Sequence, residues 1–201
     1  MAWTNYIPDD IRTLYEVHDY KHAAAILANE FPTEFGELMD ALRQFRITTA
    51  DITTSGGNES NIPKIISRIL RPLGWREDKM RAEMLVDGKP VHSDTHWVDY
   101  IKGRVAFDLE WNSKDQTFDR DLFAFRSFHE FGRISAAVLL TRSADLNLVF
   151  KALDVKAKYG ASTTWMGKLL PRLDAGRGGG CPLLVLGITP RLIIDWTEPR
   201  N

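Results

Sequence analysis

The sequence contains little cysteine and no long hydrophobic run. Cys181 is the single cysteine among 201 residues, so the chain cannot form an internal disulfide, and this predicts a reducing cytoplasmic environment. No apolar run approaches the roughly 20 residues that cross a bilayer, so we expect no membrane partner. Residues 1–12 lack a basic segment followed by an apolar stretch, which predicts that no signal peptide is present. These features favour a cytoplasmic protein stabilised by its own hydrophobic core.

The chain also has little net charge, but its charge is unevenly distributed. The formal net charge is −1. Residues 1–40 carry eight acidic and two basic residues, whereas residues 142–177 carry seven basic and three acidic residues. Such asymmetry can make one face positive although the total is nearly neutral. The pattern permits a polyanionic partner such as nucleic acid without requiring one.

No repeat, low-complexity tract or linker divides the chain, which predicts a single domain over residues 1–201. Residues 1–72 have mainly helical patterns, and we expect them to pack on a sheet formed by the rest of the chain. Helix formers and apolar residues at spacings of three and four predict the helices. They are expected over residues 18–31, 33–45 and about 62–70.

Residues 73–190 alternate between strand and helix patterns. This order predicts an α/β fold in which a central mixed β-sheet is flanked by helices. The expected elements are a strand and turn within residues 75–91 with the turn at Asp87-Gly88, a hairpin over residues 98–111, a helix over residues 115–132, a strand over residues 133–141, a helix over residues 145–160 and a strand over residues 182–188.

The predicted hairpin over residues 98–111, "VDYIKGRVAFDLEW", places acids among residues that favour burial. A two-residue turn at Lys102-Gly103 would pair the strands on either side of it. Asp99, Asp108 and Glu110 would then share one face of the hairpin, because side chains two apart on a strand point the same way. Asp99 and Asp108 would be diagonal neighbours about 7–8 Å apart at the backbone. Val98 and the apolar residues of the second strand would face the other way.

Three carboxylates on one partly buried face repel one another unless a positive charge lies among them. Mg²⁺ is a common solution, because it binds one or two carboxylates together with waters. Such an ion polarises a phosphoryl oxygen and acidifies a bound water. A solvent-facing sheet edge with scattered acids explains the same spacing, so the hairpin alone leaves both interpretations open.

The spacing D-x(8)-D-x-E on adjacent strands resembles the PD-(D/E)xK nuclease motif. More specifically, "DYIKGRVAFDLEWNSKDQTFDRDLFAFR" is similar to the active-site segment of the BglII/BstYI type II restriction endonucleases. The segments "YGASTTWMGKLL" and "AGRGGGCPLLVLGITP" resemble the C-terminal part of that family. The resemblance covers about residues 50–190 and is strongest at residues 98–126 and 176–190. It implies a restriction-endonuclease-like fold, with the catalytic core and the DNA-recognition segment in residues 73–190.

The resemblance also implies roles for individual residues. Asp99 matches the first metal-binding aspartate and Asp108 the second acid, and the main-chain carbonyl of Leu109 would be a further metal ligand. Glu110 stands where most of the superfamily has lysine, although this branch has Gln or Glu there. Glu110 would complete the catalytic trio, either as a metal ligand or by orienting the attacking water. Glu59 would be an outer acidic ligand, or simply an acid at the entry of a helix.

Other positions match segments that touch DNA in the family. The alternative for each is an ordinary solvated loop or a flexible turn. The candidate DNA-binding residues are Asn112, Ser113, Lys114, Ser162, Thr163, Thr164 and Arg177.

The resemblance implies a Mg²⁺-dependent endonuclease, with Mn²⁺ able to substitute, that acts on double-stranded DNA as a homodimer. Its palindromic site would contain a GATC core, and cleavage would leave 5′-phosphate ends and a four-base 5′ overhang. The host would be bacterial or archaeal, with a cognate DNA methyltransferase protecting its genome. Two alternatives stay open: a structure-selective repair or junction-resolving nuclease, and a non-catalytic DNA-binding protein.

Overall fold

The computed structural model describes residues 2–54, 60–80, 83–92 and 96–197, and its centre is a mixed β-sheet. The strands of this sheet are β1 (Tyr15–Tyr20), β2 (Arg76–Met80), β5 (His96–Lys102), β6 (Val105–Glu110), β7 (Ala136–Arg142) and β8 (Leu183–Ile188). They are arranged in the order β1-β8-β7-β6-β5-β2. The pairs β6–β7 and β7–β8 are parallel, and the remaining pairs are antiparallel.

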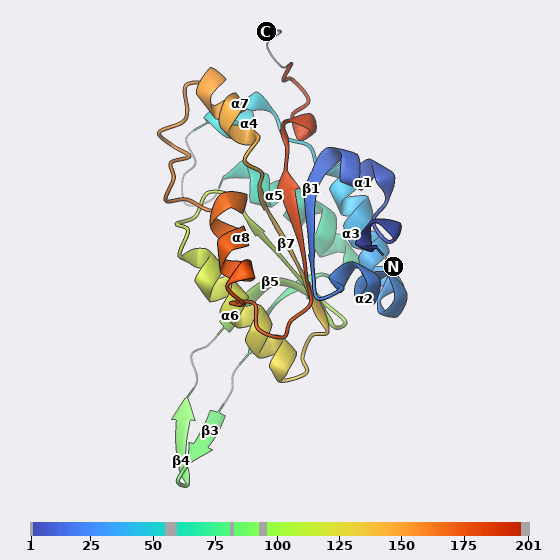
Figure 1. Cartoon of the computed structure of the whole chain (residues 1–201), viewed down its shortest axis with the longest axis vertical. Helices are drawn as coiled ribbons and strands as arrows, with labels where there is room; N and C mark the ends of the chain where they lie inside the picture. The colour runs from blue at the N-terminus through green and yellow to red at the C-terminus, as the bar shows by residue number, and fades with distance from the viewer. Residues whose placement is uncertain (1, 55–59, 81–82, 93–95, 198–201) are drawn as a thin grey trace.

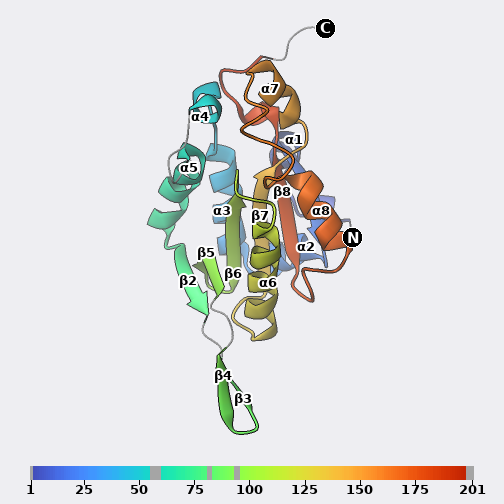
Figure 2. The ribbon, with the colours of Figure 1, turned by 90° about the vertical axis from the view of Figure 1, so that its left-hand side faces the viewer.

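Helices cover both faces of this sheet (Figure 1). The helices are α1 (Asp9–Leu14), α2 (Ala23–Glu30), α3 (Pro32–Gln44), α4 (Thr49–Thr53), α5 (Asn61–Leu70), α6 (Thr117–Glu130), α7 (Leu146–Ala152) and α8 (Met166–Asp174), with short 3₁₀ turns at Trp3–Asn5, Arg71–Leu73 and Pro190–Leu192. Helices α2, α3 and α5 contribute to one hydrophobic cluster, and α6 and α8 to a second cluster on the opposite face. Figure 2 shows α3 and α5 on one side of the strands and α6 and α8 on the other. The predicted α/β architecture is confirmed.

The three parallel strands are the most deeply buried part of the fold. Every residue of β6, β7 and β8 is buried. Strands covered on both faces read as continuous apolar runs, as in "AAVLLTR" and "LLVLGI". Parallel neighbours require crossover connections, and these contain α6 between β6 and β7 and α7 and α8 between β7 and β8. No helix in the described ranges combines the length and apolar character needed to cross a membrane.

Two helix predictions are wrong in extent. The helix expected over residues 18–31 is β1 followed by α2, because residues 15–20 pair with β8 as an antiparallel edge strand. Lys21 and His22 have positive φ and turn the chain sharply between the two elements. The helix expected over residues 145–160 ends at Ala152. Asp154 adopts a left-handed conformation, and the Val155 N–H closes the helix by donating to the Phe150 carbonyl.

The turn predicted at Asp87-Gly88 is confirmed. It joins β3 (Glu83–Val86) to β4 (Lys89–His92) in a hairpin that is paired from Glu83–His92 to Val86–Lys89. Both residues of its turn have positive φ, which Asp and Gly tolerate better than most residues. The hairpin extends away from the six-stranded sheet in both views (Figures 1 and 2).

Helix α7 provides a matched test of the core. Leu146 is fully buried, whereas Leu148, two residues later, is 67% exposed. We expect Leu146→Ala to lower the free energy of unfolding by about 2–5 kcal/mol, because it removes buried methyl groups and leaves a cavity. Leu148→Ala should change it by no more than about 0.5 kcal/mol. Urea denaturation measures both; equal losses would contradict this packing of α7.

Candidate active site

The turn between β5 and β6 sets the register of the candidate acids. Its central residues are Gly103 and Arg104, since Lys102 pairs with Val105 and Tyr100 with Phe107. The predicted turn at Lys102-Gly103 is therefore wrong. Of the two central residues only Gly103 has positive φ, as a type II′ turn requires at its first position. The register differs from the predicted one by two residues, and an even shift leaves every side chain of β6 on its predicted face.

A bulge in β5 gives Asp99 its position. Arg76 pairs with Ile101 but Asp78 pairs with Val98, so β5 carries one extra residue between these pairs. Such bulges re-aim side chains and free backbone groups from the ladder. The backbone N–H of Asp99 donates to Oδ1 of Asp108 at 2.7 Å. Asp99 is thus directly beside Asp108 rather than diagonal to it.

The bulge also corrects the prediction for Val98. Val98 is fully buried in the cluster that contains Ala106 and the apolar side of α6. It therefore lies on the same side of the sheet as the second-strand residue Ala106, rather than facing the other way.

Two of the predicted acids lie inside the protein. Asp108 is 4% exposed and Glu110 is 7% exposed, whereas Asp99 is exposed. Burial raises the pKa of Asp108 well above its usual range, and the charges of Asp99, Asp121 and Glu110 raise it further. Burial also raises the pKa of Glu110, although the Ser113 side chain, as a hydrogen-bond partner, and the charge of Arg120 oppose the rise.

Helix α6 adds a buried acid that the sequence reasoning missed. Asp121 is 3% exposed. Burial, and then the charge of Glu110, raise the pKa of Asp121 to about 8. Phe118, Leu122 and Phe125 form a buried stripe on this helix, and an acid next to that stripe was the signal available in the sequence. The site therefore holds four acids rather than three.

Arg120, the residue before Asp121, brings a cation to this cluster. Its Nη2 lies 3.2 Å from Oδ1 of Asp121 and 4.0 Å from Oε1 of Glu110, and its side chain is 70% exposed. Oε2 of Glu110 and Oδ2 of Asp121 are buried without a hydrogen-bond donor in the described part of the chain.

The donor set fits a divalent cation in its chemistry. Within the described ranges, no three His, Cys, Asp or Glu side chains are gathered closely enough to hold an ion as they stand. The carboxyl oxygens of Asp99, Asp108 and Glu110 are nevertheless hard donors, and the buried ones repel one another when ionised. A divalent cation would relieve that repulsion. Leu109 lies between the two buried acids on β6, and Glu59 lies outside the described residues.

Six of the candidate DNA-binding residues lie in two segments that pair with each other. Lys114 and Thr163 form an antiparallel bridge, and the Thr164 N–H donates to the Ser113 carbonyl at 2.9 Å. Lys114 and Ser162 are exposed, whereas Thr164 is fully buried. The structure therefore brings together the end of the β6 segment and the loop before α8.

Asn112, one of these six, and Arg177, the seventh candidate, have specific partners. The side-chain amide of Asn112 donates to the Lys158 carbonyl at 3.4 Å. Arg177 forms an ion pair with Asp119 of α6 and is 55% exposed. It lies just beyond α8, so this ion pair links the end of α8 to the first turn of α6.

Comparison with known proteins agrees with this architecture. A search of curated proteins found no match. A model of the restriction endonuclease BglII/BglIII family, however, matches residues 15–188, which is most of the chain. The matched span contains the six-stranded sheet, α6, α8 and all four acids. The chain therefore belongs to the BglII/BglIII family of type II restriction endonucleases, which are site-specific deoxyribonucleases.

Proposed function

We propose that the chain cuts double-stranded DNA at a palindromic site with a GATC core, using Mg²⁺, and that Mn²⁺ can substitute. Cleavage leaves 5′-phosphate ends and a four-base 5′ overhang. The observation that carries the proposal is the acid cluster of Asp99, Asp108 and Glu110 at the β5–β6 hairpin, in a chain of this family. Residues 1–201 act as one nuclease domain, and two copies form a homodimer whose symmetry matches the site. A cognate methyltransferase protects the host genome.

The side chains of this site would have different roles in the reaction. Asp99 and Asp108 would hold the cation, with the main-chain carbonyl of Leu109 as a further donor. The bound cation supplies Lewis acidity at the scissile phosphate. Glu110 would orient the attacking water through its carboxylate. Arg120 balances the charge of the cluster from the solvent side and lies where a phosphate would approach.

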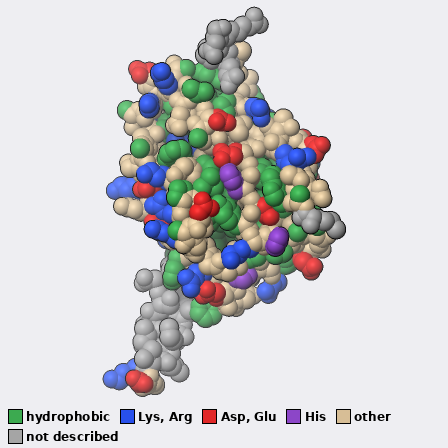
Figure 3. All heavy atoms as spheres, in the orientation of Figure 1, with side chains coloured by type: hydrophobic (Ala, Val, Ile, Leu, Met, Phe, Trp, Pro, Cys, Tyr) green, Lys and Arg blue, Asp and Glu red, His purple; other side chains and the backbone are tan. Residues whose placement is uncertain are grey.

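Basic side chains lie on both sides of the cluster. Lys and Arg side chains gather along the left edge in Figure 3, beside α6 and α8. In Figure 2, which faces that edge, β5 and β6 lie between α5 and α6. On α5 and the turn after it, Lys64, Arg68 and Arg71 line an open cavity of about 450 Å³. Because a cation at each of these positions can neutralise a phosphate, we infer that the DNA backbone passes over α5 on its way to the acids.

Plasmid digestion tests the activity and its residues together. Asp108→Asn should lower the cleavage rate on the order of a hundredfold or more, because a cation held by fewer donors loses several kcal/mol of transition-state stabilisation. Wild type should give discrete fragments with Mg²⁺ and none with EDTA, and sequencing of the ends identifies the site. Asp40→Asn, an exposed aspartate of α3, is the matched control and should cut normally.

Other outcomes identify the alternatives. Cleavage of branched DNA with plain plasmid left intact would favour a structure-selective nuclease. Intact DNA at every Mg²⁺ concentration would favour a non-catalytic DNA-binding protein. Thermal unfolding of Asp108→Asn should be no lower than wild type, since the substitution removes a buried acid among acids.

The raised pKa values predict how stability depends on pH. These carboxyl groups hold their protons in the folded chain up to a higher pH than in the unfolded chain, where they ionise near 4. Between about pH 4 and 8 the unfolded chain therefore binds fewer protons, so the free energy of unfolding in EDTA should fall as pH rises.

Asp121→Asn should flatten this fall, and Mg²⁺ should offset it at pH 8 for the wild-type protein. Asp40→Asn should keep the wild-type slope. Urea denaturation at several pH values measures the effect, and an unchanged slope in Asp121→Asn would contradict the proposed coupling of the buried acids.

The α5 residues predict a salt dependence. Each phosphate contact contributes about 0.9 to the slope of log affinity against log salt concentration. Lys64→Ala with Arg68→Ala should reduce that slope by about two and weaken binding to specific and non-specific duplexes alike. Fluorescence anisotropy in EDTA measures it. Lys151→Ala, at an exposed position of α7, is the control; a slope unchanged in the double variant would remove α5 from the interface.

A further inference from the structure

Arg142, at the end of β7, is a buried arginine without an acidic partner. It is 2% exposed, and no acidic side chain of the described residues acts on its charge. Its guanidinium carbon lies 5.8 Å from the ring centroid of Trp111, 5.4 Å from that of Phe150 and 5.1 Å from that of Tyr159. Burying an unpaired charge is costly, and interactions with three aromatic faces offset only part of that cost.

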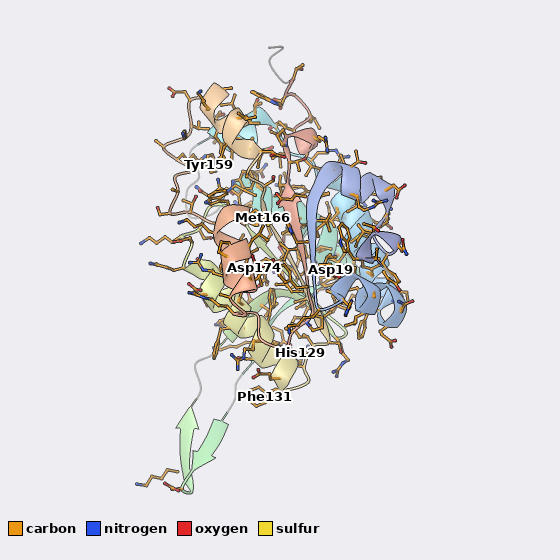
Figure 4. All side chains as sticks on the ribbon, in the orientation of Figure 1. Asp19, His129, Phe131, Tyr159, Met166 and Asp174 are labelled. Carbon is orange, nitrogen blue, oxygen red and sulfur yellow. The ribbon has the colours of Figure 1, made fainter. Side chains whose placement is uncertain are left out.

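The polar contacts of Arg142 all go to one short loop. Nε and Nη2 both donate to the Thr164 carbonyl, at 2.9 and 2.6 Å, and Nη2 also donates to Oγ1 of Thr163 at 2.6 Å. Thr163 in turn donates to the Gly160 carbonyl at 2.7 Å. This loop connects α7 to α8, and Tyr159 marks it in Figure 4. The fork of one guanidinium therefore fixes the backbone of residues 160–164.

The same loop is bonded to the segment that follows the candidate acids. The Thr164 N–H donates to the Ser113 carbonyl, and the Asp115 N–H donates to the Ser162 carbonyl, both at 2.9 Å. Ser113 lies three residues after Glu110, and its side chain is a hydrogen-bond partner of that carboxyl group. A continuous set of contacts thus leads from Arg142 through Thr164 and Ser113 to Glu110.

We propose that Arg142 is a positioning residue that joins the 160–164 loop to Glu110, so that correct docking of DNA on the loop sets the geometry of the chemistry. This inference rests on the proposed function, in which the loop contacts DNA and Glu110 serves the reaction. A residue that only filled the core would not need a charge, and a lysine could not present two donors to one carbonyl together with a third contact.

Kinetics on two substrates distinguish positioning from packing. One duplex carries the cognate site and the other differs from it by one base pair. Arg142→Lys keeps the positive charge but removes the guanidinium group, whose Nε and Nη2 contact Thr163 and Thr164. Thr163→Val removes the hydroxyl that accepts from Arg142, at a partly exposed position where folding is less at risk. We expect Arg142→Lys to lower kcat on the cognate site by about 10- to 100-fold, as for loss of hydrogen bonds to a charged group. KM should change little, and discrimination between the two duplexes should shrink.

A readout that needs no DNA keeps the inference testable by itself. Amide hydrogen exchange at Thr164 and Asp115 should become faster in Arg142→Lys and in Thr163→Val, with the amides of β7 and β8 unchanged. Arg43→Met, an exposed arginine of α3 that pairs with Asp10 and Asp40, is the control for both assays.

The outcomes separate cleanly. If Arg142→Lys lowers kcat by the same factor on both duplexes, and that factor equals the loss of folded, active enzyme, the positioning role is overturned. Unchanged amide exchange at Thr164 and Asp115 in Arg142→Lys would overturn it too. If the wild-type protein cuts no DNA, the proposed function fails, and the exchange data still decide whether Arg142 holds the loop against the β6 segment.

Discussion

Mutual repulsion of carboxyl groups, buried in an open sheet that helices cover on both faces, is the constraint on which this structure depends. Asp108 and Glu110 lie on β6, a strand that is covered on both faces and paired with β7 along its whole length. Each apolar neighbour that stabilises β6 also removes water from these acids, so stability and a charged site compete at the same residues. Asp121 of α6 increases the conflict. In the proposed function, a divalent cation bound among these oxygens would relieve their repulsion.

Local features of the backbone make the cluster possible. The bulge in β5 turns the Asp99 N–H away from the ladder and toward Asp108, which supplies one hydrogen bond to a buried carboxylate. The same bulge leaves Asp99 itself exposed, so one acid of the set stays hydrated while its neighbours are buried. A regular strand would have used that N–H in pairing with β2. The irregularity is thus part of how the site is built.

The sequence predicted the architecture and the face of each acid on β6 because both depend on periodicity. Because side chains alternate with a period of two, a register error of two residues leaves each side chain on the same face. The incorrect prediction of the turn at Lys102-Gly103 therefore did not change the predicted face of Asp108 or Glu110. The prediction failed where tertiary contacts override local pattern. Residues 15–20 read as the start of a helix but pair with β8, which lies far away in the sequence. Asp121 and Arg142 were missed for a related reason, since an apolar stripe beside Asp121, or the end of a strand at Arg142, does not by itself show that the charged side chain is buried.

By its resemblance to the wider nuclease motif, Glu110 would take the place where most members carry lysine, and the positive charge of that lysine would then have to come from elsewhere. Among the described residues, Arg120 brings a cation to Glu110 and Asp121 from the first turns of α6. Helix α6 thus supplies both an additional acid and the compensating base, one residue apart. A guanidinium that is mostly exposed can turn from a carboxylate to a phosphate with little loss of solvation, whereas a buried one could not. In the proposed function, Arg120 would neutralise the acids before DNA arrives and would turn to the phosphate once a cation is bound among the carboxylates.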